Sequence, residues 1–159
     1  MGGAINGGNR TSAAEFNIFV DPEAADIVFK SELPITMCGL DVTHKAIVFK
    51  EDIEKIKSIS NPVAKLLGDI LENLSKYHKE DGIEGCYLHD PVAVSCVANP
   101  NIIKTIPLKV DIELQGKYTT GATVGNFNKR FNHNPNADVA FHIDREAFVK
   151  EIIELMKKY

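Results

Sequence analysis

A short stretch near the N-terminus carries side chains that could bind a ligand. After a glycine-rich start at residues 2–8 come Asn9, Glu15, Phe16 and Asn17. Amides donate and accept hydrogen bonds, and a carboxylate accepts them from hydroxyl groups, so this set suits a polyhydroxylated ligand. Phe16 could offer a flat apolar face to a ring. The alternative is a glycine-rich turn whose polar side chains satisfy nearby backbone groups.

A second candidate lies in the middle of the chain, in Leu88-His89-Asp90-Pro91. An imidazole can donate or relay a proton near neutral pH. A carboxylate held at a helix N-terminus suits a metal ligand. The alternative for Asp90 is the N-cap of an apolar helix that follows it.

Both candidates belong to longer strings that resemble one family. Residues 7–25 read GGN-x-T-x-A-A-E-F-N-x-x-x-D-P-E-A-A, which resembles the inosine-uridine nucleoside hydrolase family. Residues 39–44 and 88–91 resemble the same family in the same order. The resemblance therefore spans most of the chain. An unrelated α/β sugar-binding protein is a third possibility, which requires these matches to be coincidence.

The resemblance implies hydrolysis of a purine or pyrimidine ribonucleoside to ribose and free base, with water activated by calcium. It implies ribose contacts at the positions matching Asn9, Glu15 and Asn17. Phe16 matches an aromatic residue near the base or sugar.

The resemblance also implies roles for residues in the second half of the chain. Asp90 matches a residue that binds calcium and ribose, and His89 matches a catalytic residue beside the leaving base. Tyr77 lies where the family has a mobile flap over the substrate. A tyrosine that caps the core is the alternative for Tyr77.

One family motif is absent from the sequence. The family's aspartate-rich motif, Asp-x-Asp-x-Gly-x-Asp-Asp, supplies most calcium ligands and the catalytic base, and it precedes the glycine stretch. We therefore expect residues 1–159 to form a single segment, the C-terminal half of a nucleoside hydrolase domain, inactive alone. The alternative is a truncated or degenerate module that binds ribose or nucleoside, or serves a structural role, without turnover. The sequence does not indicate which base is preferred.

A half-domain should also associate. A sheet cut in its middle exposes an edge strand and an apolar face. We expect the chain to pair with the missing N-terminal half or to self-associate as a homo-oligomer.

The composition argues against nucleic acid and membranes as partners. The 159 residues are 44% hydrophobic and 25% charged, with a net charge of −4, which favours a globular protein and gives no basic footprint for nucleic acid. No apolar run is long enough to cross a membrane. Cys38, Cys86 and Cys96 have no paired spacing, which favours free thiols in a reducing, cytoplasmic compartment.

The elements that must position these residues alternate between helix and strand. Asp21 and Pro22 predict a helix that ends near Ser31, and residues 35–39 predict a short buried strand. This order predicts an α/β fold like that of nucleoside hydrolases, with a mostly parallel open sheet flanked by helices. Asp41 and Thr43, which follow that strand, are expected to bond the local backbone rather than a ligand.

Two helices follow. Residues 51–59 predict a short charged helix, and Asn61 with Pro62 predicts the start of a long amphipathic one. We expect the long helix to pack on the sheet through one apolar face: Val63, Leu66, Leu67, Ile70, Leu71, Leu74 and Tyr77. His44 and His78 are expected to be outside the site.

In the C-terminal part, apolar and polar residues alternate with the period of a β-strand. Alternation over residues 104–114, a turn, and residues 118–124 predict a β-hairpin. The asparagine-rich residues 126–136 predict a loop. A last strand at 139–143 and a helix capped by Asp144 complete the chain.

Overall fold

The computed structural model describes residues 1–80, 82–128, 130 and 134–159. These residues form two compact units, each built from two segments. Unit 1 contains residues 1–43 and 103–143, and unit 2 contains residues 44–102 and 144–159. The assignment of the chain to one domain stays a prediction. Part of the predicted loop at 126–136 lies outside the described residues.

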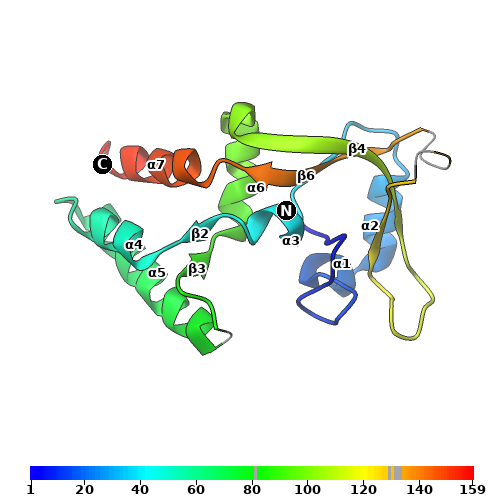
Figure 1. The fold of residues 1–159 in the computed structure, drawn as a ribbon, viewed down its shortest axis with the longest axis horizontal. Helices are drawn as coiled ribbons and strands as arrows, with labels where there is room; N and C mark the ends of the chain where they lie inside the picture. The colour runs from blue at the N-terminus through cyan, green and yellow to red at the C-terminus, as the bar shows by residue number, and fades with distance from the viewer. Residues whose placement is uncertain (81, 129, 131–133) are drawn as a thin grey trace. The chain divides into compact units, whose positions relative to one another are not determined.

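Unit 1 is organised around a four-stranded sheet with strand order β1-β6-β4-β5 (Figure 1). The strands are β1 (Thr36–Met37), β4 (Ile103–Ile112), β5 (Thr123–Asn126) and β6 (Ala137–Ile143). The predicted α/β class and the hairpin are confirmed. The described sheet is mixed rather than mostly parallel, because β4 pairs antiparallel with both β5 and β6 and only β1 pairs parallel, with β6.

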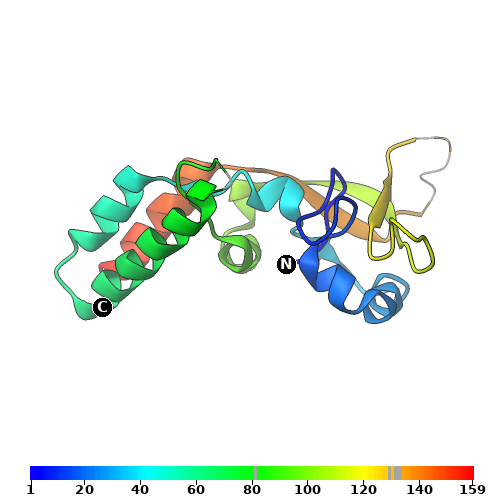
Figure 2. The same cartoon turned by 90° about the horizontal axis from the view of Figure 1, so that it is seen from below.

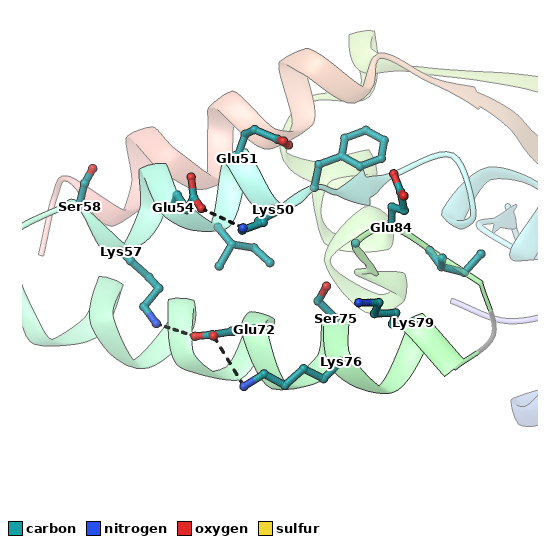
Figure 3. Close-up of a pocket in the computed structure, with 14 residues that line it drawn as sticks. Lys50, Glu51, Glu54, Lys57, Ser58, Glu72, Ser75, Lys76, Lys79 and Glu84 are labelled. Atoms are coloured by element: carbon teal, nitrogen blue, oxygen red, sulfur yellow. Dashed lines mark hydrogen bonds and ion pairs between the residues drawn. The ribbon is translucent and has the colours of Figure 1, made fainter.

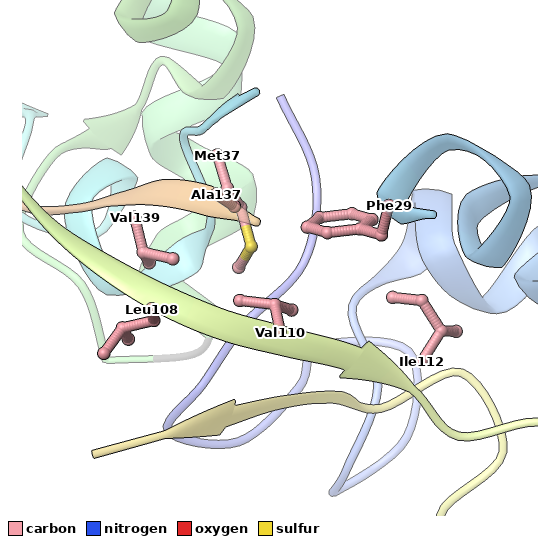
Figure 4. Close-up of a cluster of buried hydrophobic side chains, with 7 residues drawn as sticks. All are labelled: Phe29, Met37, Leu108, Val110, Ile112, Ala137 and Val139. Carbon is pink, nitrogen blue, oxygen red and sulfur yellow. The ribbon is translucent and has the colours of Figure 1, made fainter. Parts of the chain in front are cut away.

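The helices of unit 1 cover one face of that sheet. They are α1 (Phe16–Val20), α2 (Pro22–Phe29) and α3 (Leu40–Thr43). As predicted, Asp21 caps α2, its Oδ1 accepting from the Ala24 amide at 2.9 Å. Figure 4 shows the apolar core beneath α2. Its buried members are Phe29, Met37, Leu108, Val110, Ile112, Ala137 and Val139.

Unit 2 is mainly helical. Its helices are α4 (Lys50–Lys57), α5 (Pro62–Glu80), α6 (His89–Ala98), the 3₁₀ turn η1 (Pro100–Ile102) and α7 (Arg145–Met156). Two short strands, β2 (Ile47–Val48) and β3 (Cys86–Tyr87), pair antiparallel. Figure 2 shows α4 beside both α5 and α7. The predicted caps are confirmed, since Asn61 Oδ1 accepts from Ala64 N at 2.8 Å and Asp144 Oδ1 from Ala147 N at 3.0 Å.

The face that α5 buries differs from the prediction. The helix packs mainly against α4, with a smaller contact to the short strand β3, and it buries Ala64, Gly68 and Leu71. Small residues allow this close approach: a Cβ on Gly68 would lie 2.2 Å from Lys57 Cγ. The larger apolar side chains are left exposed, among them Val63, Leu66, Ile70 and Tyr77.

No disulfide joins the three cysteines, of which Cys38 and Cys86 are buried and Cys96 is half-buried. Burial raises the pKa of Cys86 to about 11, so this thiol stays protonated and unreactive at neutral pH. Across the described residues, no helix combines the length and the apolarity that a membrane crossing needs.

Candidate functional site

The glycine-rich start of the chain is fixed onto unit 1 by backbone hydrogen bonds. The Gly3 carbonyl accepts from Leu40 N at 2.9 Å. Thr123, only 4% exposed, accepts from the Ala4 amide at 2.8 Å, and its hydroxyl donates back to the Ala4 carbonyl at 2.7 Å. The loop is thus held by α3 and by the hairpin strand β5 together. Sequence reasoning missed Thr123, because a buried threonine 119 residues away leaves no local signal.

Two glycines are required for this close approach. At Gly3, where φ is +80°, a Cβ would lie 2.7 Å from Met37 Cε. At Gly8 a Cβ would lie 2.1 Å from the Ala14 carbonyl oxygen. Glycine thus avoids backbone strain at position 3 and a clash with the backbone at position 8.

The Asp41 side chain bonds residues that are distant in sequence, which the sequence did not predict. Its Oδ2 accepts from Ile5 N at 2.7 Å, and its Oδ1 accepts from the backbone and side-chain amides of Asn6 at 3.1 and 2.7 Å. The expectation that Asp41 bonds the local backbone is therefore wrong. The carboxylate instead ties the glycine-rich loop to α3, across a sequence separation that no local pattern reveals.

Glu15 is the best-anchored of the predicted site residues. Its side chain is 2% exposed. The carboxylate accepts from Gly3 N at 2.9 Å, from Asn17 N and Nδ2 at 2.9 and 3.0 Å, and from Ile18 N at 3.3 Å. Glu15 thereby caps α1 and fastens the loop at once. These bonds are what the local-turn alternative expects, and a ribose contact by Glu15 stays a prediction.

The other predicted residues of unit 1 lie beside Glu15 with exposed side chains. Asn9 Oδ1 accepts from Phe16 N at 2.9 Å. Phe16 is 52% exposed, and Asn9 and Asn17 are exposed as well. The structure therefore brings all four residues together, with the carboxylate inside and two amides and an aromatic face outside.

We expect Glu15→Gln to destabilise the protein by about 2 to 3 kcal/mol. A glutamine keeps one acceptor oxygen, but its amide group faces backbone N–H donors that lose their partner. The measurement is the free energy of unfolding in urea. Glu84→Gln, at an exposed position in unit 2, serves as the matched control. Equal stability of the two variants would show that the buried carboxylate is not needed.

The predicted residues of unit 2 lie at the start of α6. His89 is the first residue of the helix, and the N-cap is Leu88, not Asp90 as one alternative expects. The helix begins before Pro91 because a proline in the first turn removes no intrahelical hydrogen bond. Asp90 is exposed in that first turn. Among the described residues, its carboxylate takes part in no hydrogen bond or ion pair.

Rings surround Tyr87, just before α6. The Tyr87 ring stacks on His44 with centroids 4.5 Å apart, and it contacts His78 at 5.2 Å and His89 at 5.6 Å. His44 and His89 also contact each other at 5.6 Å. Tyr77 joins through His78 at 5.7 Å. We name these five residues the ring cluster. The sequence did not predict these ring contacts of His44 and His78 with Tyr87, and the expectation that both lie outside the site stays a prediction.

The ring cluster forms because β2 pairs with β3, which brings the segment before β2 beside Tyr87. Two-residue strands have no readable period, so the sequence did not predict it. Within the part of the chain that is described, the half-buried His78 has no hydrogen-bond partner for its Nδ1.

The described residues do not form a calcium site by themselves. Calcium takes about six to eight oxygen ligands. Among these residues, no three His, Cys, Asp or Glu side chains are placed to hold one metal ion. Asp90 is thus at most one ligand of a larger set.

A groove of about 840 Å³ between α4 and α5 is separate from the predicted residues, none of which lines it. Figure 3 shows its charged rim, where Lys57 bonds Glu72 at 2.7 Å and Lys76 lies 3.6 Å from the same carboxylate. Glu72 and Asp69 raise the pKa of Lys57. Because its lining carries charges of both signs, several of them paired with one another, this groove indicates no particular ligand.

The sequence comparisons all match this chain to nucleoside hydrolases. Residues 1–150 match the family model described as inosine-uridine preferring nucleoside hydrolase. The chain is 47% identical over 161 residues to a pyrimidine-specific ribonucleoside hydrolase RihA of Photobacterium profundum, and 45% identical to that of Salmonella schwarzengrund. Each match covers 100% of this chain and 52% of the relative. The chain therefore spans about half the length of the curated relatives it matches.

The solved structures that superpose on this chain are also nucleoside hydrolases. A purine-preferring ribonucleoside hydrolase from Gardnerella vaginalis superposes with a TM-score of 0.87 at 32% identity, over 100% of this chain and 52% of that one. A plant nucleoside hydrolase, PpNRh1, superposes with a TM-score of 0.90 at 29% identity, over 99% and 52%.

Proposed function

The chain belongs to the inosine-uridine preferring nucleoside hydrolase family, and from this we propose that it contributes binding and leaving-group residues to a ribonucleoside hydrolase. The match over residues 1–150 carries the proposal. We further propose pyrimidine ribonucleosides as the preferred substrates. This rests on the relatives at 45% to 47% identity, which are named pyrimidine-specific.

The reaction divides into tasks that different residues perform. Cleavage of the bond between ribose C1′ and the base nitrogen passes through a transition state that resembles an oxocarbenium ion. The ribose must be held, the departing base must receive a proton or have its charge stabilised, and a water molecule must be activated. This chain offers residues for the first two tasks.

Ribose binding is proposed for unit 1. Asn9 and Asn17 present exposed amides, which can donate to and accept from sugar hydroxyls. Glu15 holds the loop that carries them, and we keep it as a candidate ribose contact. Phe16 is proposed to lie against the sugar or the base.

Leaving-group assistance is proposed for unit 2. His89 would donate a proton from its imidazole to the departing pyrimidine, so that the base leaves neutral. Tyr77, which is 66% exposed near the end of α5, is proposed to close over the bound substrate.

Asp90 is proposed as this chain's ligand to calcium and to a ribose hydroxyl. Its exposed carboxylate is available, and the remaining ligands and the base that activates water would come from outside the described residues. Calcium, when bound, would lower the pKa of the attacking water.

Ribose release by the complete protein tests the proposal. We expect turnover of uridine and cytidine, slower turnover of inosine, and none by the 159-residue chain alone. Inosine preferred over uridine would overturn the pyrimidine assignment. Binding of uridine without any ribose release would instead support the alternative, a non-catalytic nucleoside-binding module.

We also propose that the chain associates with a segment like the half of its relatives that it does not match, or with itself. The exposed apolar side chains of α5 support this. Light scattering of the purified chain is expected to show a species larger than a monomer, and a monodisperse monomer that unfolds cooperatively would contradict it. The lack of any disulfide among the three cysteines supports a cytoplasmic location, which cell fractionation would check.

A further inference from the structure

We propose that Tyr87 is a positioning residue for His89: its ring sets the orientation of the imidazole that faces the leaving group. This inference rests on the proposed leaving-group role of His89, but the contact itself can be tested without turnover.

The backbone of Tyr87 is fixed by the small sheet of unit 2. Tyr87 pairs with Ile47 and Cys86 pairs with Val48, and both Cys86 and Val48 are 0% exposed. At the adjacent Gly85 a Cβ would lie 2.6 Å from the Val48 carbonyl oxygen, so only glycine allows this pairing. Tyr87 is therefore anchored at the point where the chain enters α6.

His89 follows Tyr87 by two residues, and its ring lies against two others. The ring planes of His89 and Tyr87 are inclined at 46°, and those of His89 and His44 at 61°, with both centroid distances 5.6 Å. Tilted and edge contacts at such distances are the arrangements that aromatic rings prefer. A rotation of the His89 side chain would break both contacts, so the two neighbours select one rotamer.

Tyr87 is the common member of these contacts. It stacks on His44 at 4.5 Å with an interplanar angle of 29°, so it holds the second neighbour of His89 as well as touching His89 directly. The Tyr87 ring also contacts His78 of α5 at 5.2 Å, so this helix supports it as well. Removing the Tyr87 ring would therefore remove one neighbour of His89 and the stacking support of the other, whereas removing His44 would remove one neighbour only.

Orientation matters for a proton donor. Proton transfer requires the donor within hydrogen-bond reach of the acceptor atom, and a misplacement of roughly 1 Å can lower a rate about 10²-fold. The ring cluster contains three imidazoles, from His44, His78 and His89, but only His89 lies at the helix start beside Asp90. A positioning role for Tyr87 explains why an aromatic ring sits at this point of the chain.

The contact is tested by NMR on the 159-residue chain, with Tyr87→Leu and the conservative Tyr87→Phe. We expect Tyr87→Leu to shift the His89 ring resonances and to weaken the cross-relaxation between the His44 and His89 rings, and Tyr87→Phe to keep the resonance positions and the cross-relaxation of the unsubstituted chain. The exposed His142 of unit 1 should not shift in either variant. If Tyr87→Leu does not fold, His44→Ala, at an exposed position, should shift the same His89 resonances. Unchanged His89 resonances in a folded Tyr87→Leu or His44→Ala variant would overturn the inference.

The rate is tested in the complete protein. Tyr87→Leu is expected to lower kcat for uridine about tenfold to 10²-fold with KM nearly unchanged, and Tyr87→Phe is expected to restore most of the loss. A loss confined to KM would contradict a positioning role. If His89→Ala has no effect on turnover while Tyr87→Leu still moves the His89 ring, the leaving-group proposal fails and the structural inference stands.

Discussion

Replacing Asp90 with alanine in the complete enzyme is expected to lower kcat/KM for uridine by about 10²- to 10³-fold, the usual effect of removing one prearranged polar group from an active site. The Asp90 carboxylate is exposed in the first turn of α6. Since it bonds no other described residue, its loss should leave the fold intact. Ribose release measures the rate, and a titration with calcium should show that the variant needs more of the ion for half-maximal activity.

Glu23→Ala is the matched control for this experiment. Glu23 is also an exposed carboxylate in the first turn of a helix, α2. Both substitutions remove a charge that interacts with a helix dipole, which is worth about 0.3 to 1 kcal/mol. The two variants therefore differ only in the role that we propose for Asp90 in the site. Equal activity of Asp90→Ala and Glu23→Ala would reduce Asp90 to a surface residue and remove the proposed calcium ligand.

Helix starts were predictable because a cap is a local interaction. Asp21, Asn61 and Asp144 each accept a hydrogen bond from the amide three residues ahead, and that spacing is visible in the sequence. Strand β4 was predictable for a similar reason, since the alternation of apolar and polar residues over 104–114 indicates a half-buried strand. These features need no knowledge of the rest of the chain.

The face that α5 buries was not predictable in this way. An amphipathic pattern shows where the large apolar residues lie, but the packed side also depends on how closely another helix can approach. Gly68 and Ala64 admit α4, and the larger residues Leu66 and Ile70 are left exposed. For a chain that spans about half the length of its relatives, the pattern of a complete domain does not have to be buried within the chain.

The candidate site was predictable where it follows a continuous string. Asn9, Glu15, Phe16 and Asn17 were found together in the sequence and are together in unit 1. The ring cluster around Tyr87 was missed because strand pairing brings His44 to Tyr87 and the contact of α5 with β3 brings His78 there, and neither contact has a local sequence signal. The fixation of the loop by Asp41 and Thr123 was missed for the same reason.

His89→Ala in the complete enzyme is expected to lower kcat for uridine about 10²- to 10⁴-fold, the usual contribution of a general acid. Uracil leaves poorly as an anion, so removal of the proton donor raises the barrier of the cleavage step. A 4-nitrophenyl riboside has a leaving group that departs as a stable phenolate and needs no proton. Its hydrolysis should therefore fall far less in the same variant.

The contrast between the two substrates distinguishes proton donation from ribose binding and from loss of the fold. If His89 merely held the ribose or the fold, both substrates would lose rate to a similar extent, and the leaving-group role would be wrong. His142→Ala is the matched control, because His142 is an exposed histidine on β6 of unit 1 and should leave both rates unchanged. A large loss on uridine, a small loss on the nitrophenyl riboside and no loss in the control together assign the proton to His89, because no general loss of stability or of ribose binding depends on the leaving group.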